Sequence, residues 1–165
     1  MIRICFLLLF IGVALLCRAQ KSLREMSVCQ VVDQRLGLTG RVLVYGTDSG
    51  DGVLRGECTG PTKIRGYTYP KAIWVSDATQ REQTEFVENC TTCITFYKYI
   101  ELTSKDRMAK KNQTFNVRMV GRVRAIEDRK GSSKLGPLPG FGYLGLFPVE
   151  FIAIGVEKWE RIPEK

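Results

Sequence analysis

Residues 89–102 read Asn89-Cys90-Thr91-Thr92-Cys93-Ile94-Thr95-Phe96-Tyr97-Lys98-Tyr99-Ile100-Glu101-Leu102, and this stretch decides the predicted fold class. Apolar side chains recur on one side of the run, at Ile94, Phe96, Ile100 and Leu102. Polar and amphipathic side chains take the other side, at Thr95, Tyr97, Tyr99 and Glu101. Such alternation is the period of a β-strand with one buried face. The close cysteine pair at its start adds a cross-link, so the stretch predicts a disulfide-bonded, mainly β domain.

The start of the chain has the organisation of a secretory signal peptide. Arg3 supplies a positive charge, residues 4–16 are almost continuously apolar, and Cys17-Arg18-Ala19 has small residues where a signal peptidase cleaves. The apolar core is short for a membrane-spanning helix, so a retained signal anchor fits less well. We therefore predict that residues 1–19 are removed and that the protein is secreted and extracellular.

The predicted mature chain, residues 20–165, keeps four of the six cysteines: Cys29, Cys58, Cys90 and Cys93. An even number in an oxidising compartment predicts two disulfides, and three pairings are possible. Removing Arg3 and Arg18 from the 25 basic residues leaves 23 against 17 acidic ones, so the net charge falls from +8 to +6. This surplus favours solubility and attraction to anionic surfaces.

Strand patterns and turn signals alternate along the mature chain. A hairpin is expected from residues 38–45 and 53–58 around a turn rich in Gly, Asp and Ser, followed by a strand interrupted by Pro70 in residues 64–74. Residues 76–85 have the outline of a capping box and predict a short helix or a loop. Residues 103–112 are strongly polar and predict an exposed connection, whereas residues 115–125 and 149–159 predict strands.

These patterns predict one secreted β domain over residues 20–165. Residues 36–127 form its expected core, and residues 149–165 add a C-terminal strand and tail. Residues 128–148 between them are rich in glycine and proline, which prevents a long regular element and predicts an elaborated loop.

No catalytic constellation is visible, so we expect no enzyme activity, no cofactor and no metal. The chain contains no histidine, which excludes Ser-His-Asp and Cys-His nucleophiles. Asp48 and Asp51 lie in one turn but lack the further ligands of a calcium loop. A thiol-disulfide oxidoreductase using Cys90 and Cys93 is the enzymatic alternative. Such pairs usually precede a helix, however, and the residues that follow here have a strand pattern.

The expected strand at residues 115–125 carries an arginine-rich outer face with Arg118, Arg122 and Arg124, and Lys130 lies just beyond it. These four residues are the candidate binding residues for an anionic glycan or lipid surface. The alternative is a solvated sheet face laced with salt bridges. Asn-x-Thr acceptors at Asn89 and Asn112 predict N-glycosylation in a secreted protein.

Two parts of the chain are similar to a known family. Arg35-Leu-Gly-Leu-Thr-Gly-Arg-Val-Leu-Val-Tyr-Gly46 resembles the opening strand of the nematode transthyretin-like secreted proteins. The order of cysteine pair, alternating strand and lysine-bearing loop in residues 90–117 is similar to that family's second half. The resemblance implies a small antiparallel β-sandwich that binds without catalysing a reaction, and it assigns no binding residue. Netrin or metalloproteinase-inhibitor barrels are the alternative, although the expected Cys-x-Cys at the mature start is missing.

The sequence therefore predicts a secreted binding or interaction protein without catalytic activity. Its expected partner is an extracellular or cell-surface protein, or an anionic glycan or lipid surface. Nucleic acid is not expected for a secreted chain. The alternatives are the oxidoreductase named above and a secreted protease inhibitor of the netrin-like type.

Overall fold

The computed structural model describes residues 23–110, 112–128 and 139–163. The predicted signal peptide, the candidate binding residue Lys130 and much of the Gly/Pro-rich loop lie outside the described residues. The described chain is mainly β, with more residues in strands than in helices, as the sequence predicts.

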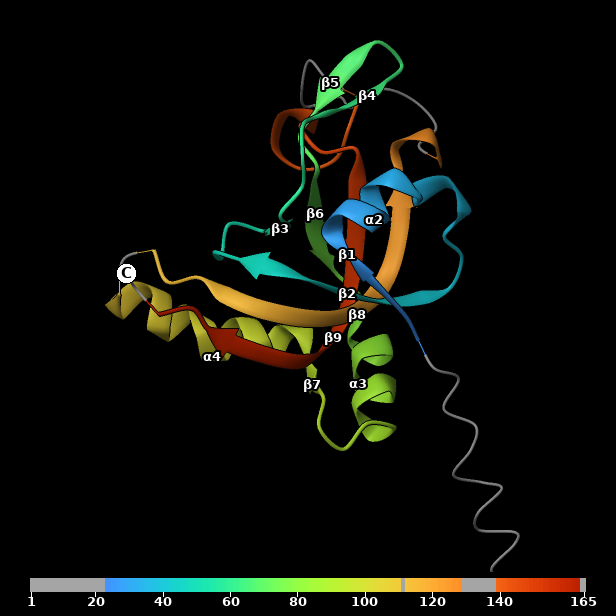
Figure 1. The fold of residues 1–165 in the computed structure, drawn as a ribbon. Helices are drawn as coiled ribbons and strands as arrows, with labels where there is room; N and C mark the ends of the chain where they lie inside the picture. Colours follow the sequence, from blue (N-terminus) through green and yellow to red (C-terminus); the bar gives the residue numbers. More distant parts are fainter. Residues whose placement is uncertain (1–22, 111, 129–138, 164–165) are drawn as a thin grey trace, which may run out of the picture.

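A seven-stranded sheet forms the body of the protein (Figure 1). Its strands are β1 (Arg24–Ser27), β2 (Arg41–Asp48), β3 (Val53–Arg55), β6 (Ala72–Asp77), β7 (Ile94–Thr95), β8 (Phe115–Ala125) and β9 (Val149–Arg161). A separate hairpin consists of β4 (Thr62–Ile64) and β5 (Tyr67–Tyr69), and it projects from one end of the molecule.

The sheet closes on itself because β8 pairs with both β2 and β9. The path from β2 through β3, β6, β9 and β8 back to β2 makes a five-stranded barrel. Only the β6–β9 pair of the barrel is parallel. A small barrel of five strands is similar in architecture to the OB fold, a five-stranded Greek-key barrel. The transthyretin-like sandwich is not confirmed.

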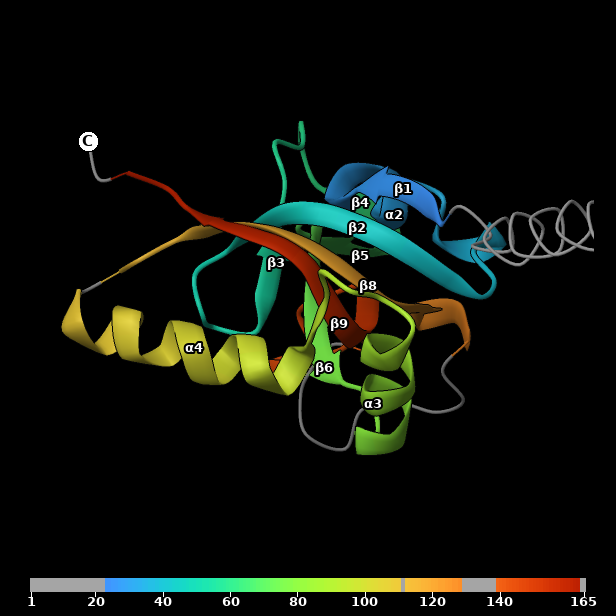
Figure 2. The same cartoon turned by 90° about the horizontal axis from the view of Figure 1, so that it is seen from below.

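Helices close the ends of the barrel. The short α2 (Val28–Asp33) follows β1 directly, and η1 (Arg35–Gly37) leads from it toward β2. α3 (Gln80–Glu88) and α4 (Phe96–Ala109) fill the crossover between β6 and β8 and lie together below the barrel (Figure 2). Single 3-10 turns, η2 (Ile126–Asp128) and η3 (Tyr143–Gly145), flank the undescribed part of the loop.

Several predicted elements are confirmed. β2 and β3 form the expected hairpin. The strand predicted over residues 64–74 is broken at Pro70, but the chain also turns at residues 65–66, so Ile64 ends β4, β5 follows the turn and β6 begins after the proline. α3 begins with the capping box of Thr79 and Glu82, which satisfies two backbone N–H groups at once. The register of β8 against β9 shifts at Gly121, where an added Cβ would lie 2.4 Å from the Ile152 carbonyl oxygen. The extra residue at this shift is Ile154 of β9, so a β-bulge lies opposite the glycine.

The prediction of a strand over residues 94–102 is wrong, because only Ile94 and Thr95 are extended and α4 begins at Phe96. Thr95 is the N-cap, and its side chain accepts a hydrogen bond of 3.1 Å from the Lys98 N–H. The buried side chains are Phe96, Tyr99 and Thr103, which is the i, i+3, i+7 stripe of a helix. Apolar residues that also matched a strand period, such as Ile100, remain partly exposed.

The same correction removes the exposed connection predicted for residues 103–112. Most of that polar run is the second half of α4, in which Lys, Arg, Met and Ala are good helix formers. The buried side chains of α4 lie between Phe96 and Thr103, so this part packs the helix against the domain and the residues after it can be polar. The long β8–β9 pair extends alongside α4 (Figures 1 and 2).

A buried polar cluster fastens α4 to the end of the β2 strand. Asp48 accepts hydrogen bonds of 2.7 Å from the Tyr99 hydroxyl and 2.7 Å from Arg107 Nη2. Arg107 also donates to the Thr103 hydroxyl over 3.0 Å, and its guanidinium lies 5.1 Å from the Phe115 ring centroid. Burial, followed by the charge of Asp48, raises the pKa of Tyr99 above its ordinary value. The cluster satisfies a buried carboxylate with two donors from the helix, so it determines where α4 docks.

We predict that Tyr99→Phe lowers the free energy of unfolding by about 1.5–3 kcal/mol, because a hydrogen bond to a charged acceptor is lost.

The same substitution should change how the free energy of unfolding depends on pH. In the wild type the folded chain keeps the Tyr99 proton above pH ~10 while the unfolded chain releases it, so stability falls as pH rises through about 10. Urea unfolding from about pH 8 to about pH 11 should show a shallower fall in the variant. Tyr97→Phe, at a tyrosine that is 70% exposed, is the control. Equal slopes in all three proteins would contradict the prediction.

Candidate functional site

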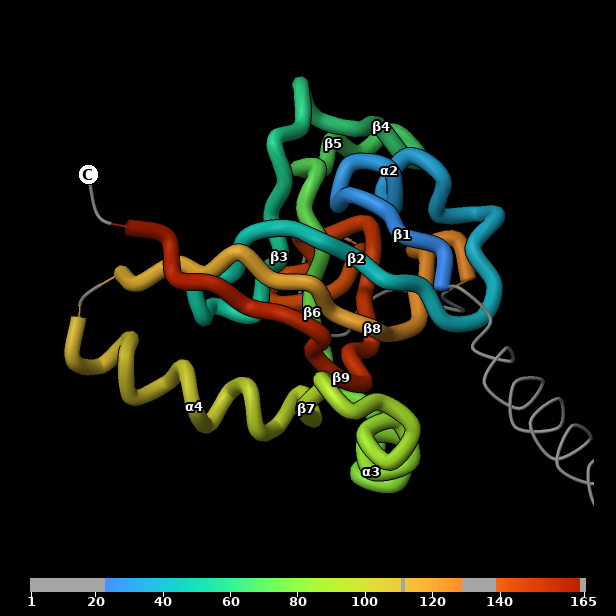
Figure 3. Tube along the Cα trace, turned by 60° about the horizontal axis from the view of Figure 1, so that its bottom comes forward, coloured from blue at the N-terminus to red at the C-terminus, as the bar shows by residue number. Residues whose placement is uncertain are grey.

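An open groove of about 560 Å³ lies on the outer face of the barrel, where β2 changes neighbours. One edge of β2 pairs with β8 along its whole length. The other edge pairs first with β1, from Val42 to Tyr45, and then with β3, at Thr47 and Asp48. Gly46 lies between the two partners, and the groove opens at this gap. Figure 3 shows β1 and β3 following one another along β2.

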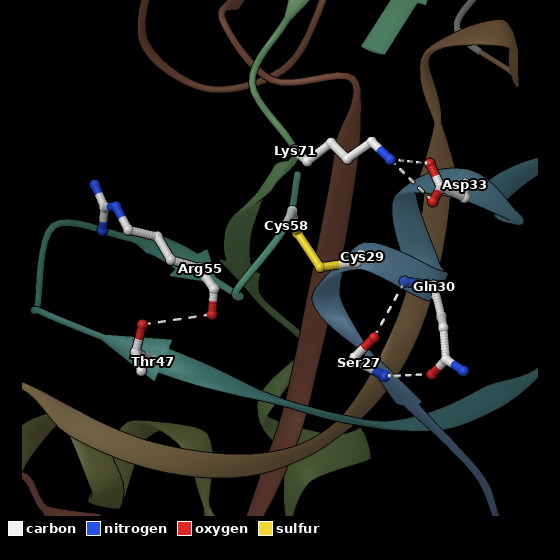
Figure 4. The surroundings of a disulfide bond; sticks show 8 residues. All are labelled: Ser27, Cys29, Gln30, Asp33, Thr47, Arg55, Cys58 and Lys71. Atoms are coloured by element: carbon white, nitrogen blue, oxygen red, sulfur yellow. Dashed lines mark hydrogen bonds and ion pairs between the residues drawn. A yellow bond between two sulfur atoms is a disulfide. The ribbon is translucent and has the colours of Figure 1, made fainter. Parts of the chain in front are cut away.

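The disulfide Cys29–Cys58 forms one wall of the groove and joins α2 to the segment after β3 (Figure 4). Ser27 caps α2 through a capping box with Gln30, which holds the start of this wall. Glycines allow the close approach: a Cβ at Gly46 would lie 2.5 Å from the Arg55 carbonyl oxygen, and one at Gly56 would lie 3.0 Å from Val28. The wall is therefore covalently and sterically constrained.

Two rows of outward side chains cross the strands that floor the groove. The register places Tyr45, Arg118 and Lys158 side by side on β2, β8 and β9. Thr47, Asn116 and Glu160 form the next row, and Arg55 on β3 is the neighbour of Thr47. All of these residues line the groove. The floor thus presents an exposed aromatic ring, hydroxyl and amide groups, and charges of both signs.

Each basic side chain of the groove already has an acidic partner. Arg55 pairs with Asp51 over 2.5 Å, and the hydrogen bond from Arg55 lowers the pKa of that carboxyl. Arg118 lies 3.0 Å from Glu157 and 3.3 Å from Glu25, and Lys158 lies 2.6 Å from Glu160. The groove therefore carries charges of both signs and is not a simple cationic patch.

The structure separates the predicted arginine stripe. Arg118 lies in the groove, whereas Arg122 pairs with Glu82 of α3 over 2.8 Å and Arg124 pairs with Glu150 over 2.9 Å, both away from it. The Arg124 guanidinium also lies 5.6 Å from the Phe141 ring centroid. These ion pairs match the alternative prediction, a sheet face laced with salt bridges. Lys130 lies outside the described residues.

Of the residues that line the groove, sequence reasoning singled out only Arg118 and Cys29, and it missed Tyr45, Lys158 and the other members of the two rows. Tyr45 follows three consecutive buried residues, so no alternation marks it as exposed. Its neighbours were not predictable either, because strand register across β2, β8 and β9 depends on tertiary pairing.

All four predicted disulfide cysteines are paired, as Cys29–Cys58 and Cys90–Cys93. The long strand predicted after Cys93, which counted against a redox role for this pair, is wrong, because a two-residue strand and then α4 follow. The surroundings of the pair also disfavour a reactive thiolate. The Cys90 N–H donates to the Val87 carbonyl at the C-terminal end of α3, where the helix dipole disfavours a thiolate, and Cys93 is 6% exposed.

Two kinds of site are absent from residues 23–110, 112–128 and 139–163. No group of three or more His, Cys, Asp or Glu side chains is arranged to hold a metal ion. In that same part of the chain, no helix has both the length and the apolar character that a membrane span requires.

The comparisons add no relative: no protein-family model matches the sequence, no curated protein matches it, and no solved structure matches it. The similarities to the transthyretin-like and netrin-like families therefore stay predictions.

The two glycosylation acceptors have different surroundings. Asn89 ends α3, and its side-chain amide donates a 2.7 Å hydrogen bond to the Glu85 carbonyl, next to the Cys90 disulfide. Asn112 is exposed in the turn between α4 and β8 with φ of 68°, a conformation that asparagine tolerates. Both asparagines are exposed, but the hydrogen bond and the neighbouring disulfide hold the Asn89 side chain against its own helix.

We predict that Asn112 carries most of the N-linked glycan. Expressed through a secretory pathway, Asn112→Gln should abolish the mobility shift that peptide N-glycosidase F produces in the wild type, and Asn89→Gln should leave it in place. Intact-protein mass spectrometry gives the occupancy of each position. Loss of the shift in Asn89→Gln alone would refute the assignment.

Proposed function

We propose that the protein is a secreted extracellular binding protein without catalytic activity, and that its groove binds the acidic groups of a glycan. The observation that carries this proposal is the cross-strand row Tyr45, Arg118 and Lys158, held on a closed barrel beside the Cys29–Cys58 disulfide. The disulfides and the leader-like residues 1–19 support secretion.

The rigidity of the floor supports binding over a merely solvated surface. Three of its strands belong to the closed barrel, so the row loses little conformational freedom when a ligand binds. Guanidinium and ammonium groups supply charge-assisted hydrogen bonds to carboxylate or sulfate. OB-type barrels bind oligosaccharides in other proteins, which is an argument from fold analogy alone.

A glycan fits the groove better than a lipid surface does. The groove is concave, and its lining includes only Tyr45 among large aromatic or aliphatic side chains apart from the buried Val117. A membrane-binding face needs an exposed apolar surface beside its basic groups. Anionic lipid therefore serves as the comparison ligand in the test.

We predict that the secreted protein binds immobilised heparin and that Arg118→Ser weakens this binding about 10-fold or more, because one charge-assisted hydrogen bond is worth about 1.5–3 kcal/mol. Arg122→Ser and Arg124→Ser remove equal charge from the same strand outside the groove, and they should change affinity less than about threefold. Surface plasmon resonance at several salt concentrations measures this. Vesicles of phosphatidylcholine with phosphatidylserine are the lipid comparison.

Equal losses in the three variants would indicate non-specific attraction to the basic chain and would contradict a groove site. Binding to the vesicles but not to heparin would move the ligand class to lipid head groups. No binding to either would remove the anionic form of the proposal.

A protease inhibitor of the netrin-like type is the second candidate, because a closed, disulfide-bonded barrel is what that resemblance implies and a sandwich is not. If the glycan proposal holds, we expect no inhibition of extracellular metalloproteinases at equimolar or tenfold excess in a fluorogenic peptide assay. Stoichiometric, tight inhibition of any member of the panel would replace the first proposal with this one.

A further inference from the structure

We infer that the groove recognises an acidic oligosaccharide through stacking on Tyr45, and that Glu25 occupies the place of the ligand's acidic group until the ligand displaces it. This inference rests on the proposed function and names the contacts by which the same site would select its ligand.

Tyr45 supplies the stacking surface. Tyr45 lies on β2, between Ser27 of β1 on one side and Arg118 of β8 on the other. The residue is 43% exposed. The C–H face of a pyranose ring packs on the electron-rich face of an aromatic ring, and the phenol hydroxyl remains in water. The apolar contact distinguishes a sugar from a bare polyanion, which would use the charges alone.

Arg118 supplies the group that binds the acid. Its guanidinium carries five N–H donors, and Nη2 donates a 3.3 Å hydrogen bond to Glu25. Nε lies 3.0 Å from Glu157 of the adjacent β9 and forms an ion pair with it without a hydrogen bond, so the Glu157 charge holds the guanidinium near the outer sheet face. Glu25 approaches from the edge strand β1 at the longer distance.

The Glu25 contact is the replaceable one. The Glu25 side chain is 49% exposed and that of Arg118 is 38% exposed, so water and salt screen their attraction. Exposed pairs of this kind contribute little to stability, and a carboxylate or sulfate from the ligand can replace Glu25 at small cost. Arg118 keeps its ion pair with Glu157 in either state.

Neutral polar side chains beside Tyr45 and Arg118 can form hydrogen bonds with sugar hydroxyls. Thr47 and Asn116 form the row next to Tyr45 and Arg118, and Ser27 stands at the β1 end of the groove. Each can donate and accept hydrogen bonds, as a hydroxylated ligand requires. The groove volume of about 560 Å³ lies within the range of small-ligand sites, which is about 300–1,000 Å³.

The test uses the secreted, full-length mature protein and isothermal titration calorimetry with two probes: a heparin-derived hexasaccharide and an unsulfated hexasaccharide of the same backbone. Glu25→Gln should strengthen binding about threefold to tenfold, because the competing carboxylate is gone. Tyr45→Ala should weaken it about tenfold without changing its salt dependence. Arg118→Gln should weaken it and reduce the salt dependence, and Arg124→Gln is the matched control that leaves both unchanged.

The gain expected for Glu25→Gln cannot arise from misfolding, so that variant keeps the test informative even where a loss variant is damaged. Binding of both probes would show that the sugar carboxylate suffices, and binding of the heparin fragment alone would show that sulfate is needed. Both results support the inference if Glu25→Gln binds more tightly.

Heparin binding that depends on Arg118 but is unaffected by Tyr45→Ala or Glu25→Gln would overturn the inference and leave the proposed function standing. Failure of the wild type to bind either hexasaccharide would overturn the inference, and heparin binding by the full polymer then decides the proposed function.

Discussion

The pairing of β8 with two strands is the constraint on which the structure depends. β8 hydrogen-bonds to β2 along one edge and to β9 along the other, which closes the barrel and removes the free edges of the three longest strands. Closure requires the strands to bend, and the register shift at Gly121 supplies a bend where the Phe151 ring and the Ile152 carbonyl leave no room for a Cβ. The outer residues of β2, β8 and β9 are thereby aligned in rows.

The N-terminal segment uses the part of β2 that the barrel leaves unpaired. β1 pairs with β2 in parallel, and the Cys29–Cys58 bond ties the following helix to the chain beyond β3. Two short strands thus share one edge of β2, with Gly46 at the gap between them. The groove is a direct consequence of this arrangement, because neither neighbour covers the strand at the change of partner.

Charge is balanced locally although the chain as a whole is basic. The formal net charge of +8 would favour general attraction to anions, yet Arg118, Arg122 and Arg124 each face a glutamate. An attraction that depended on net charge alone would be spread over the surface. A ligand that selects the groove must instead compete with an exposed carboxylate and use the aromatic and hydroxyl groups beside it. Buried Asp48 shows the opposite use of charge, since two of its three hydrogen-bond donors, Tyr99 and Arg107, come from α4 and fix the helix in place.

The sequence by itself determined the elements whose signal is local. The strands at residues 115–125 and 149–159, the hairpin before them and the capping box of α3 all follow from periodicity and turn chemistry that involve near neighbours. Residues 94–102 show where this reasoning stops, since Phe96 and Tyr99 satisfy a helix stripe while the flanking Ile94 and Ile100 also satisfy a strand period. Only the tertiary structure decided between helix and strand, because the contacts of Tyr99 with Asp48 and Phe115 stabilise the helix. It also decided the disulfide pairing, the closure of the barrel and the neighbours of Tyr45, which depend on contacts between residues far apart in the chain and leave no periodic signal.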